Sequence, residues 1–194
     1  MIGNRSDLSA DNREQTPVCR TAKTTIILLL LAPTALASYL AYYDLAFFQP
    51  ALASTRQQMQ SVPSAPVPAL LKQHIQSAYG QSLEFHTGTI LLRQSIFTGG
   101  DGWRSFLWGK LAAFHLSRPE QVATVVSLAY MGSNRYGFAA ASQALFDKPV
   151  EQLSSAESAT LVALSSAPAY YESHPESLLK RRDQLLGKSE NKPE

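Results

Sequence analysis

Few side chains in this 194-residue chain have the type and spacing that chemistry requires. Glu84 is the only carboxylate between residues 45 and 100, and the basic residues Arg93, Arg104 and Lys110 follow it. A carboxylate can accept a proton as a general base, and cations can hold a phosphate or a lipid headgroup. An isolated glutamate and cations along a helix are equally typical of a solvated surface, so the residue types leave both interpretations open.

The spacing of the histidine and cysteine residues does not indicate a metal or cofactor site. His74, His86, His115 and His174 are scattered without the spacing of metal ligands. Cys19 is the only cysteine, which excludes an intramolecular disulfide and a cysteine zinc site. We therefore expect no metal ion and no cofactor.

Composition narrows the class of protein further. The formal net charge is +2, and charged residues make up 16% of the chain, below the usual quarter for globular proteins. A nucleic-acid-binding protein would carry a basic patch or stripe, so we expect no nucleic-acid partner. The length suits one modest domain and a tail.

An uncharged stretch lies near the N-terminus. Residues 24–43 contain no charged side chain, and about 20 apolar residues are what a helix needs to span a bilayer core. Aromatic residues follow at its far end, as at a membrane interface. The sequence therefore predicts a polar cytoplasmic tail over residues 1–23 and a transmembrane helix over residues 24–48.

Flanking charge predicts the orientation of this span. Three basic residues lie between residues 13 and 23, whereas only Arg56 follows within a comparable distance. The positive-inside rule then places the N-terminus in the cytoplasm and residues 50–194 outside. A cleaved signal peptide ending near Ala35-Leu36-Ala37 is the alternative, and it exports the same residues.

Helical patterns dominate the rest of the chain. We expect a linker over residues 49–68, formed by a short helix and a Pro-punctuated connector, a main domain over residues 69–188 and a disordered tail over residues 189–194. Apolar periodicity predicts helices over residues 69–79, 103–116, 117–129, 136–146, 154–166 and 175–186. Residues 84–94 fit a strand or a helix equally well. The expected fold class is mainly α.

Two of these helices begin with a capping box, in which a serine and a glutamate three residues later satisfy free backbone N–H groups. The pairs are Ser117 with Glu120 and Ser154 with Glu157. Glu157 is therefore interpreted as a helix cap rather than as a catalytic group.

Three aromatic residues between positions 103 and 114 could bind a lipid chain. They are Trp103, Trp108 and Phe114. Because large aromatic side chains are mostly buried in soluble domains, packing in the core is the expected role.

Spaced residues in the second half of the chain resemble a known family. They are Tyr136-Gly137, Ala140-Ala141, Phe146, Lys148, Leu153, Glu157, Leu161, Leu164, Ala167-Pro168, Tyr171 and Arg181-Arg182. Their order resembles the YGxxxAAxxYFGK, LTLAEAALLAGL and ERRxxVL signatures of family 51 glycosyltransferases, the peptidoglycan polymerases of bifunctional penicillin-binding proteins and monofunctional transglycosylases. The resemblance is dense over residues 117–186 and thin over residues 60–116.

The resemblance implies a lysozyme-like, mainly α domain, here shortened, behind a membrane anchor. It implies lipid II as the substrate, with a glutamate base deprotonating the attacking hydroxyl while a polyprenyl pyrophosphate departs. It assigns structural positions in the family motifs to Tyr136, Gly137, Lys148, Glu157, Arg181 and Arg182.

The catalytic carboxylates of the family are not matched by type. Extending the front of the match places His74 at the glutamate of the first motif, where it is expected to be an ordinary histidine on a helix surface. Glu84 is then the local candidate for a replacement base. Arg93, Arg104 and Lys110 are candidates to face a pyrophosphate or lipid.

We therefore expect a single-pass protein of the bacterial inner membrane, with a glycosyltransferase-like domain in the periplasm that has lost polymerase activity. Its expected partners are membrane lipid and lipid II, a glycan strand or a cell-wall synthesis protein. Two alternatives stay open. One is an active glycosyltransferase with Glu84 as a displaced base, and the other is a structural membrane scaffold that binds no sugar.

Overall fold

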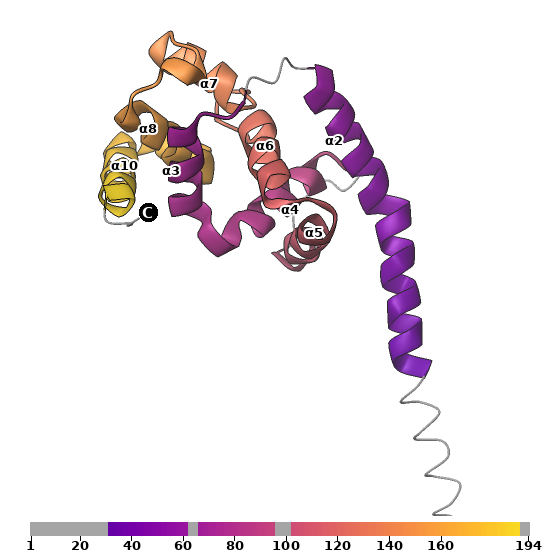
Figure 1. Ribbon diagram of the computed structural model, residues 1–194. Helices are drawn as coiled ribbons and strands as arrows, with labels where there is room; N and C mark the ends of the chain where they lie inside the picture. The colour runs from indigo at the N-terminus through magenta and orange to yellow at the C-terminus, as the bar shows by residue number, and fades with distance from the viewer. Residues whose placement is uncertain (1–30, 62–65, 96–101, 191–194) are drawn as a thin grey trace, which may run out of the picture. The chain divides into compact units, whose positions relative to one another are not determined.

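The computed structural model describes residues 31–61, 66–95 and 102–190 (Figure 1). The chain forms two compact units, Met1–Tyr43 and Asp44–Glu194. The described part of the first unit is a helix over residues 31–43. The second unit holds the other described helices and the main hydrophobic core.

The transmembrane helix expected over residues 24–48 begins in residues 24–30, which lie outside the described ranges. Within the described ranges, no helix combines the length and the apolar character needed to cross a bilayer.

The second unit is mainly α-helical, as predicted. Its elements are η1 (Asp44–Phe48, a π-helical turn), α2 (Gln49–Ser61), α3 (Ala69–Tyr79), η2 (Gly80–Ser82), α4 (Leu83–Arg93), α5 (Gly102–His115), α6 (Arg118–Leu128), α7 (Phe138–Phe146), η3 (Val150–Gln152), α8 (Ser155–Ser166), α9 (Pro168–Ser173) and α10 (Pro175–Glu190). Within the described part of the chain, β structure is limited to one isolated bridge between Tyr130 and Tyr136.

Three boundaries refine the sequence prediction. Residues 84–94, which fitted a strand or a helix, belong largely to helix α4. Helix α7 begins at Phe138 rather than at Tyr136, because Tyr136 pairs with Tyr130 and Gly137 has a φ of 81°, outside the helical region. Helix α10 continues to Glu190, beyond the predicted end at residue 186.

Both predicted capping boxes are present. The backbone N–H of Ser117 donates to Glu120 Oε2 at 2.7 Å, and that of Ser154 donates to Glu157 Oε2 at 2.8 Å. The Glu157 backbone N–H in turn donates to Ser154 Oγ at 3.3 Å. These bonds satisfy donors that a helix N-terminus leaves free, so they fix where α6 and α8 begin.

The main core joins helices that are distant in the sequence. Leu71 and Ile75 of α3, Phe138 of α7, Leu161 of α8 and Leu185 of α10 are fully buried in one cluster. Helices α3, α8 and α10 lie side by side (Figure 1), and each pair of them is in contact. The segment that carries the family resemblance therefore supplies much of this core.

Helices α4 and α5 form a second, very close contact. A Cβ atom added to Gly88 of α4 would lie 2.6 Å from the Gly109 Cα and from the Trp108 carbonyl carbon of α5. Added to Gly109, it would lie 3.0 Å from the Glu84 carbonyl oxygen. The two backbones approach to a distance that only glycine allows at this crossing.

This crossing decides which face of α5 is buried. The inward face carries the small residues Ser105, Gly109 and Ala112 beside Trp108, which is fully buried. Trp103 and Phe114 are instead 58% and 83% exposed. The expected core role is correct for Trp108 and wrong for Trp103 and Phe114, because the close approach to α4 requires small side chains at the contact.

Candidate functional site

A cleft of about 530 Å³ lies in the second unit. It opens between α4, the end of α6 and the corner that joins α8 to α9. Its lining residues are Tyr79, Phe85, His86, Thr89, Ile90, Arg93, Val125, Ala129, Tyr130, Ser165, Ser166, Ala167, Pro168, Ala169 and Tyr170. The volume falls in the range of small-molecule sites, roughly 300–1,000 Å³.

Helix α4 supplies one wall of the cleft. Phe85, His86, Thr89, Ile90 and Arg93 all line it. Their spacings of about one helical turn place them on one side of α4. The other side of the same helix packs against α5.

The corner between α8 and α9 supplies the facing wall. Helix α8 ends at Ser166, and Ala167 leaves the helical conformation with φ −154° and ψ 65°. Pro168 then occupies the first turn of α9, where its missing N–H costs little. The corner leaves Ser165 and Ser166 at the cleft.

Tyr79 connects the two walls. Its hydroxyl lies 2.6 Å from Ser165 Oγ. The Ser165 hydroxyl donates its hydrogen to the Val162 carbonyl oxygen at 2.8 Å. Because a hydroxyl has one hydrogen to donate, the Tyr79 hydroxyl is the donor in its bond to Ser165. This orders the end of α3 against the end of α8.

Burial controls protonation in the cleft. It raises the pKa of Tyr79 to about 12, and the phenol is therefore protonated at neutral pH. It lowers the pKa of His86 below its ordinary value of 6.5, so this imidazole is neutral near pH 7. The two rings pack with their centroids 4.3 Å apart.

The chemistry available in the cleft is that of binding an anionic ligand. Arg93 is the only charged side chain among the described lining residues, which include no carboxylate. The guanidinium suits a phosphate group, and the aromatic and hydroxyl side chains suit a sugar or a chain next to it. Across the described residues, no cluster of histidine, cysteine and carboxylate side chains could hold a metal ion.

The structure separates the predicted site residues. Arg93 lines the cleft, whereas Glu84, Arg104 and Lys110 do not. The Glu84 carboxylate accepts an ion-paired hydrogen bond from Lys110 of α5. The Arg104 guanidinium lies 5.8 Å from the centre of the Trp103 ring. The four residues therefore do not form one catalytic cluster.

His74 differs from the expectation of a helix-surface histidine, because it is fully buried. Its Nε2 lies 3.2 Å from Ser155 Oγ, and its Nδ1 has no hydrogen-bond partner. Burial lowers the pKa of His74 below its ordinary value of 6.5. His74 is absent from the cleft lining, so its place is at the contact of α3 with α8.

The motif residues have structural contacts. Lys148 Nζ donates to Glu157 Oε1 at 2.7 Å. This bond, followed by those from Ser154, lowers the pKa of Glu157 to about 2. Gly137 adopts its positive φ before α7, and Tyr136 pairs with Tyr130.

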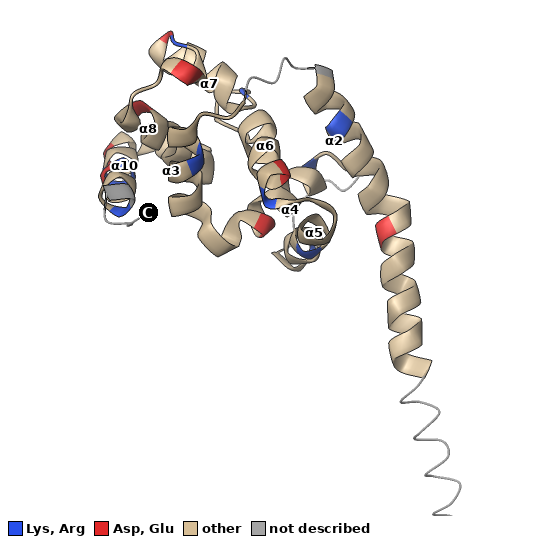
Figure 2. Ribbon diagram, viewed as in Figure 1, with Lys and Arg blue, Asp and Glu red and all other residues tan. Residues whose placement is uncertain are grey.

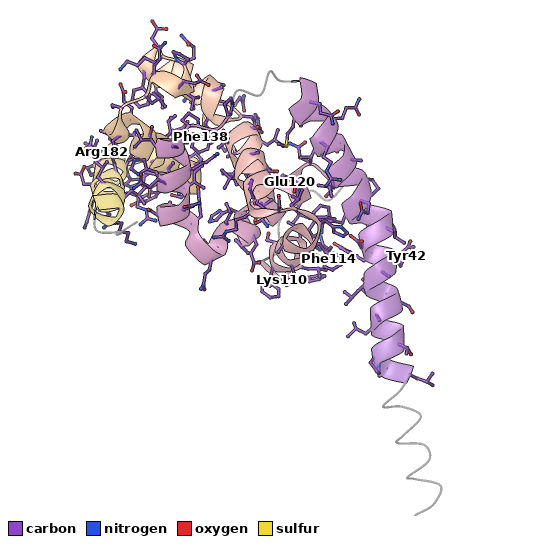
Figure 3. All side chains as sticks on the ribbon, in the orientation of Figure 1. Tyr42, Lys110, Phe114, Glu120, Phe138 and Arg182 are labelled. Atoms are coloured by element: carbon purple, nitrogen blue, oxygen red, sulfur yellow. The ribbon has the colours of Figure 1, made fainter. Side chains whose placement is uncertain are left out.

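The paired arginines of α10 differ in their surroundings. Arg182 forms an ion pair with Asp183 at 2.7 Å, and Figure 3 labels it on this helix. Arg181 Nη1 donates to Gln184 Oε1 at 3.4 Å. The positive charge of Arg181 also favours the ionised form of Tyr79, although burial outweighs this effect. Helix α10 is therefore electrostatically linked to one wall of the cleft.

Sequence reasoning missed most of the cleft. Tyr79, His86 and Ser165 were not selected as site residues, because each is unremarkable within its own helix. One signal was present: Tyr79 is a large aromatic directly before the helix-ending Gly80, whose φ is 47°. The bond between Tyr79 and Ser165 joins positions too distant for any local pattern to reveal.

Comparison with known proteins agrees with the resemblance seen in the sequence. The family model described as Transglycosylase matches residues 110–190. This range contains helices α6 to α10 and the C-terminal part of α5, residues 110–115. It excludes α3, which supplies Tyr79, and α4, which supplies the wall of the cleft that contains Arg93.

Curated relatives match over a short segment. Penicillin-binding protein 1A of Aquifex aeolicus is 49% identical over 59 residues, which cover 29% of this chain and 8% of that protein. Penicillin-binding protein 1A of Mycobacterium tuberculosis is 45% identical over 53 residues, covering 27% of this chain and 6% of that protein. Penicillin-binding protein 1F of Bacillus subtilis is 42% identical over 60 residues, covering 30% and 8%. The chain thus spans a small fraction of the length of these relatives.

Proposed function

Because residues 110–190 form a shortened transglycosylase domain of glycosyltransferase family 51, we propose that this protein is a peptidoglycan glycosyltransferase-like protein of the bacterial cell envelope. Its cleft binds lipid II or a glycan strand and does not polymerise it. The observation that carries the proposal is the charge of the cleft: one arginine, and no carboxylate among the described lining residues.

The binding role follows from the ligand's chemistry. Lipid II presents a pyrophosphate next to sugar rings. Arg93 supplies a cation for the phosphates, and Tyr130 and Tyr170 supply aromatic surface for the sugars. The cleft has both groups within one lysozyme-like domain. Arg93 therefore matches the pyrophosphate of this ligand, and the two tyrosines match its sugar rings.

The loss of polymerase activity follows from the missing base. Glycosyl transfer requires a group that removes the proton of the attacking hydroxyl. Glu84 is engaged with Lys110 and lies outside the cleft, and His74 is buried outside it. Neither candidate lines the cleft, so neither is positioned as a base for a ligand bound there.

The proposed setting is the inner membrane. The uncharged stretch over residues 24–43 supports an anchor, and the excess of basic residues before it supports a cytoplasmic N-terminus and a periplasmic domain. A wall-synthesis protein is a further candidate partner of the same domain.

The test combines binding and turnover with the purified full chain and fluorescent lipid II in detergent. We expect saturable binding and no glycan strands on a gel that resolves polymer length. Arg93→Gln should weaken binding by roughly 10- to 100-fold, as expected for the loss of a charged hydrogen bond of about 1.5–3 kcal/mol. Lys180→Gln removes an equal charge from an exposed position of α10 outside the cleft and should leave binding unchanged.

Each other outcome selects another function. Glycan strands that disappear in Glu84→Gln would establish an active glycosyltransferase with a displaced base. Neither binding nor polymer would refute the sugar-binding role and leave the structural scaffold. Binding that is equally strong in Arg93→Gln would show that the cleft is not the site.

A further inference from the structure

The outward face of α5 exposes large aromatic side chains outside the cleft. Trp103, Phe106 and Phe114 are 58%, 60% and 83% exposed. Together with Lys110 they recur every three or four residues, which places them on one side of the helix. Figure 3 labels Lys110 and Phe114, both on α5. We call these four residues the α5 aromatic face.

The outward face of α5 is more apolar than that of a typical helix in a soluble domain. Such a helix turns its large apolar residues inward and its polar residues outward. Here the crossing with α4 requires Ser105, Gly109 and Ala112 on the inside, and the larger rings of the outward face are left in solvent. A contiguous apolar patch of this kind marks an interaction surface.

The charge around the α5 aromatic face favours an anionic partner. Helix α5 carries two basic side chains, Arg104 and Lys110; the carboxylates that contact this helix are Glu84, which is ion-paired with Lys110, and Asp44, which lies 3.0 Å from His115. Helix α5 itself contains no aspartate or glutamate, and its only coloured charges in Figure 2 are blue.

The long cations also lie next to the rings. Lys110 Nζ lies 5.4 Å from the centre of the Phe106 ring, and the Arg104 guanidinium lies 5.8 Å from that of Trp103. A lipid headgroup region accommodates apolar rings that insert toward the acyl chains. Cations on long, flexible side chains can stay at the phosphates beside them.

A second copy of the chain fits this surface poorly. A two-fold contact through α5 would bring the same surface of both copies together, and would place Arg104 and Lys110 near their own counterparts. The sequence also carries an uncharged stretch of the length of a membrane span at residues 24–43. That stretch favours a bilayer as the occupant.

We propose that the α5 aromatic face docks on an anionic lipid surface, with Trp103, Phe106 and Phe114 at the boundary between headgroups and acyl chains and with Arg104 and Lys110 at the phosphates. The inference does not depend on what the cleft binds.

Tryptophan fluorescence tests the proposal in the full chain, whether or not the N-terminal stretch inserts. The chain has two tryptophans, Trp103 in the α5 aromatic face and Trp108 in the core. The difference between wild type and Trp103→Phe therefore reports on Trp103 alone. The protein is reconstituted in phosphatidylcholine vesicles with or without about 30% phosphatidylglycerol, an anionic lipid, and with or without bromine on the acyl chains.

We expect bromine to reduce Trp103 emission roughly by half in the anionic vesicles, since an interfacial ring lies about 5–10 Å deep. It should leave the Trp108 emission of Trp103→Phe unchanged. Aqueous iodide should quench Trp103 less in these vesicles than in neutral ones. Arg104→Gln should reduce the difference between the two compositions, because fewer cations then face the phosphates.

Three results would overturn the proposal. Trp103 that is quenched by iodide and unaffected by bromine would show that the face stays in water. Protection from iodide without bromine quenching, increasing with the ratio of protein to lipid, would assign the face to a second copy. Equal bromine quenching in neutral and anionic vesicles would refute the preference for anionic lipid.

Discussion

Gly88→Ala should destabilise the second unit by about 2 kcal/mol, although alanine is the better helix former. Gly88 lies inside α4, where its backbone meets that of α5. The new Cβ would lie 2.6 Å from the Gly109 Cα and from the Trp108 carbonyl carbon. These are backbone atoms, so no side chain can rotate to make room, and the two helices must move apart.

The magnitude follows from two opposing effects. Replacing glycine by alanine in a helix interior favours folding by about 1 kcal/mol. Overpacking in a core costs roughly 1–3 kcal/mol, and the upper end applies because the obstacle is backbone. The net loss is about 2 kcal/mol. For a domain of this size it corresponds to a melting temperature lower by about 4–8 °C.

The assay is thermal and denaturant unfolding of the full chain, with Gly187→Ala as the matched control. Gly187 also lies in a helix, α10, but a Cβ there would meet nothing within 4 Å. Gly187→Ala should therefore be neutral or stabilising by up to about 1 kcal/mol. If Gly88→Ala raises stability as the control does, the close contact of α4 with α5 is wrong, and with it the reason why the α5 aromatic face is exposed.

Two further results are expected. Burial lowers the pKa of His74 below 6.5, so the folded state binds fewer protons than the unfolded state, and stability is complete above that pH and lost as the pH falls below it. Unfolding experiments between about pH 5 and pH 8 should show that the free energy of unfolding rises with pH. His74→Gln should make this dependence shallower, and the part that remains should come from His86, whose pKa is also lowered by burial. Ser154→Ala should lower the free energy of unfolding by about 1 kcal/mol through the loss of a cap, and an unchanged denaturant midpoint would contradict that role.

Local features were predictable because neighbouring residues contain all the information. The three-residue spacing from serine to glutamate predicts where a helix begins. Both capping boxes, Ser117 with Glu120 and Ser154 with Glu157, form. Gly80 ends α3 because its φ of 47° is open to glycine. The spaced residues after position 117 also showed the resemblance with which the match to the Transglycosylase family model over residues 110–190 agrees.

Features that depend on packing were not predictable. Residues 84–94 fitted a strand or a helix, since Thr87, Thr89 and Ile90 favour strands and only the contact at Gly88 selects the helix. His74 has the spacing of a surface residue and is buried by α8. The cleft combines α4 with a corner some 80 residues further along the chain, as the bond from Tyr79 to Ser165, 86 positions away, illustrates.

The sequence by itself determined most of the helices, their caps and the family resemblance of the second half of the chain, because each depends on spacing along the backbone. Only the tertiary structure decided which side of a helix is inside. Helix α5 makes the difference plain: Trp103 and Phe114 were expected in the core, yet the crossing of Gly88 with Gly109 buries small residues there and leaves both rings exposed. It likewise separated Glu84 from Arg93, because neighbouring faces of α4 meet different partners: Lys110 on one side and the cleft on the other.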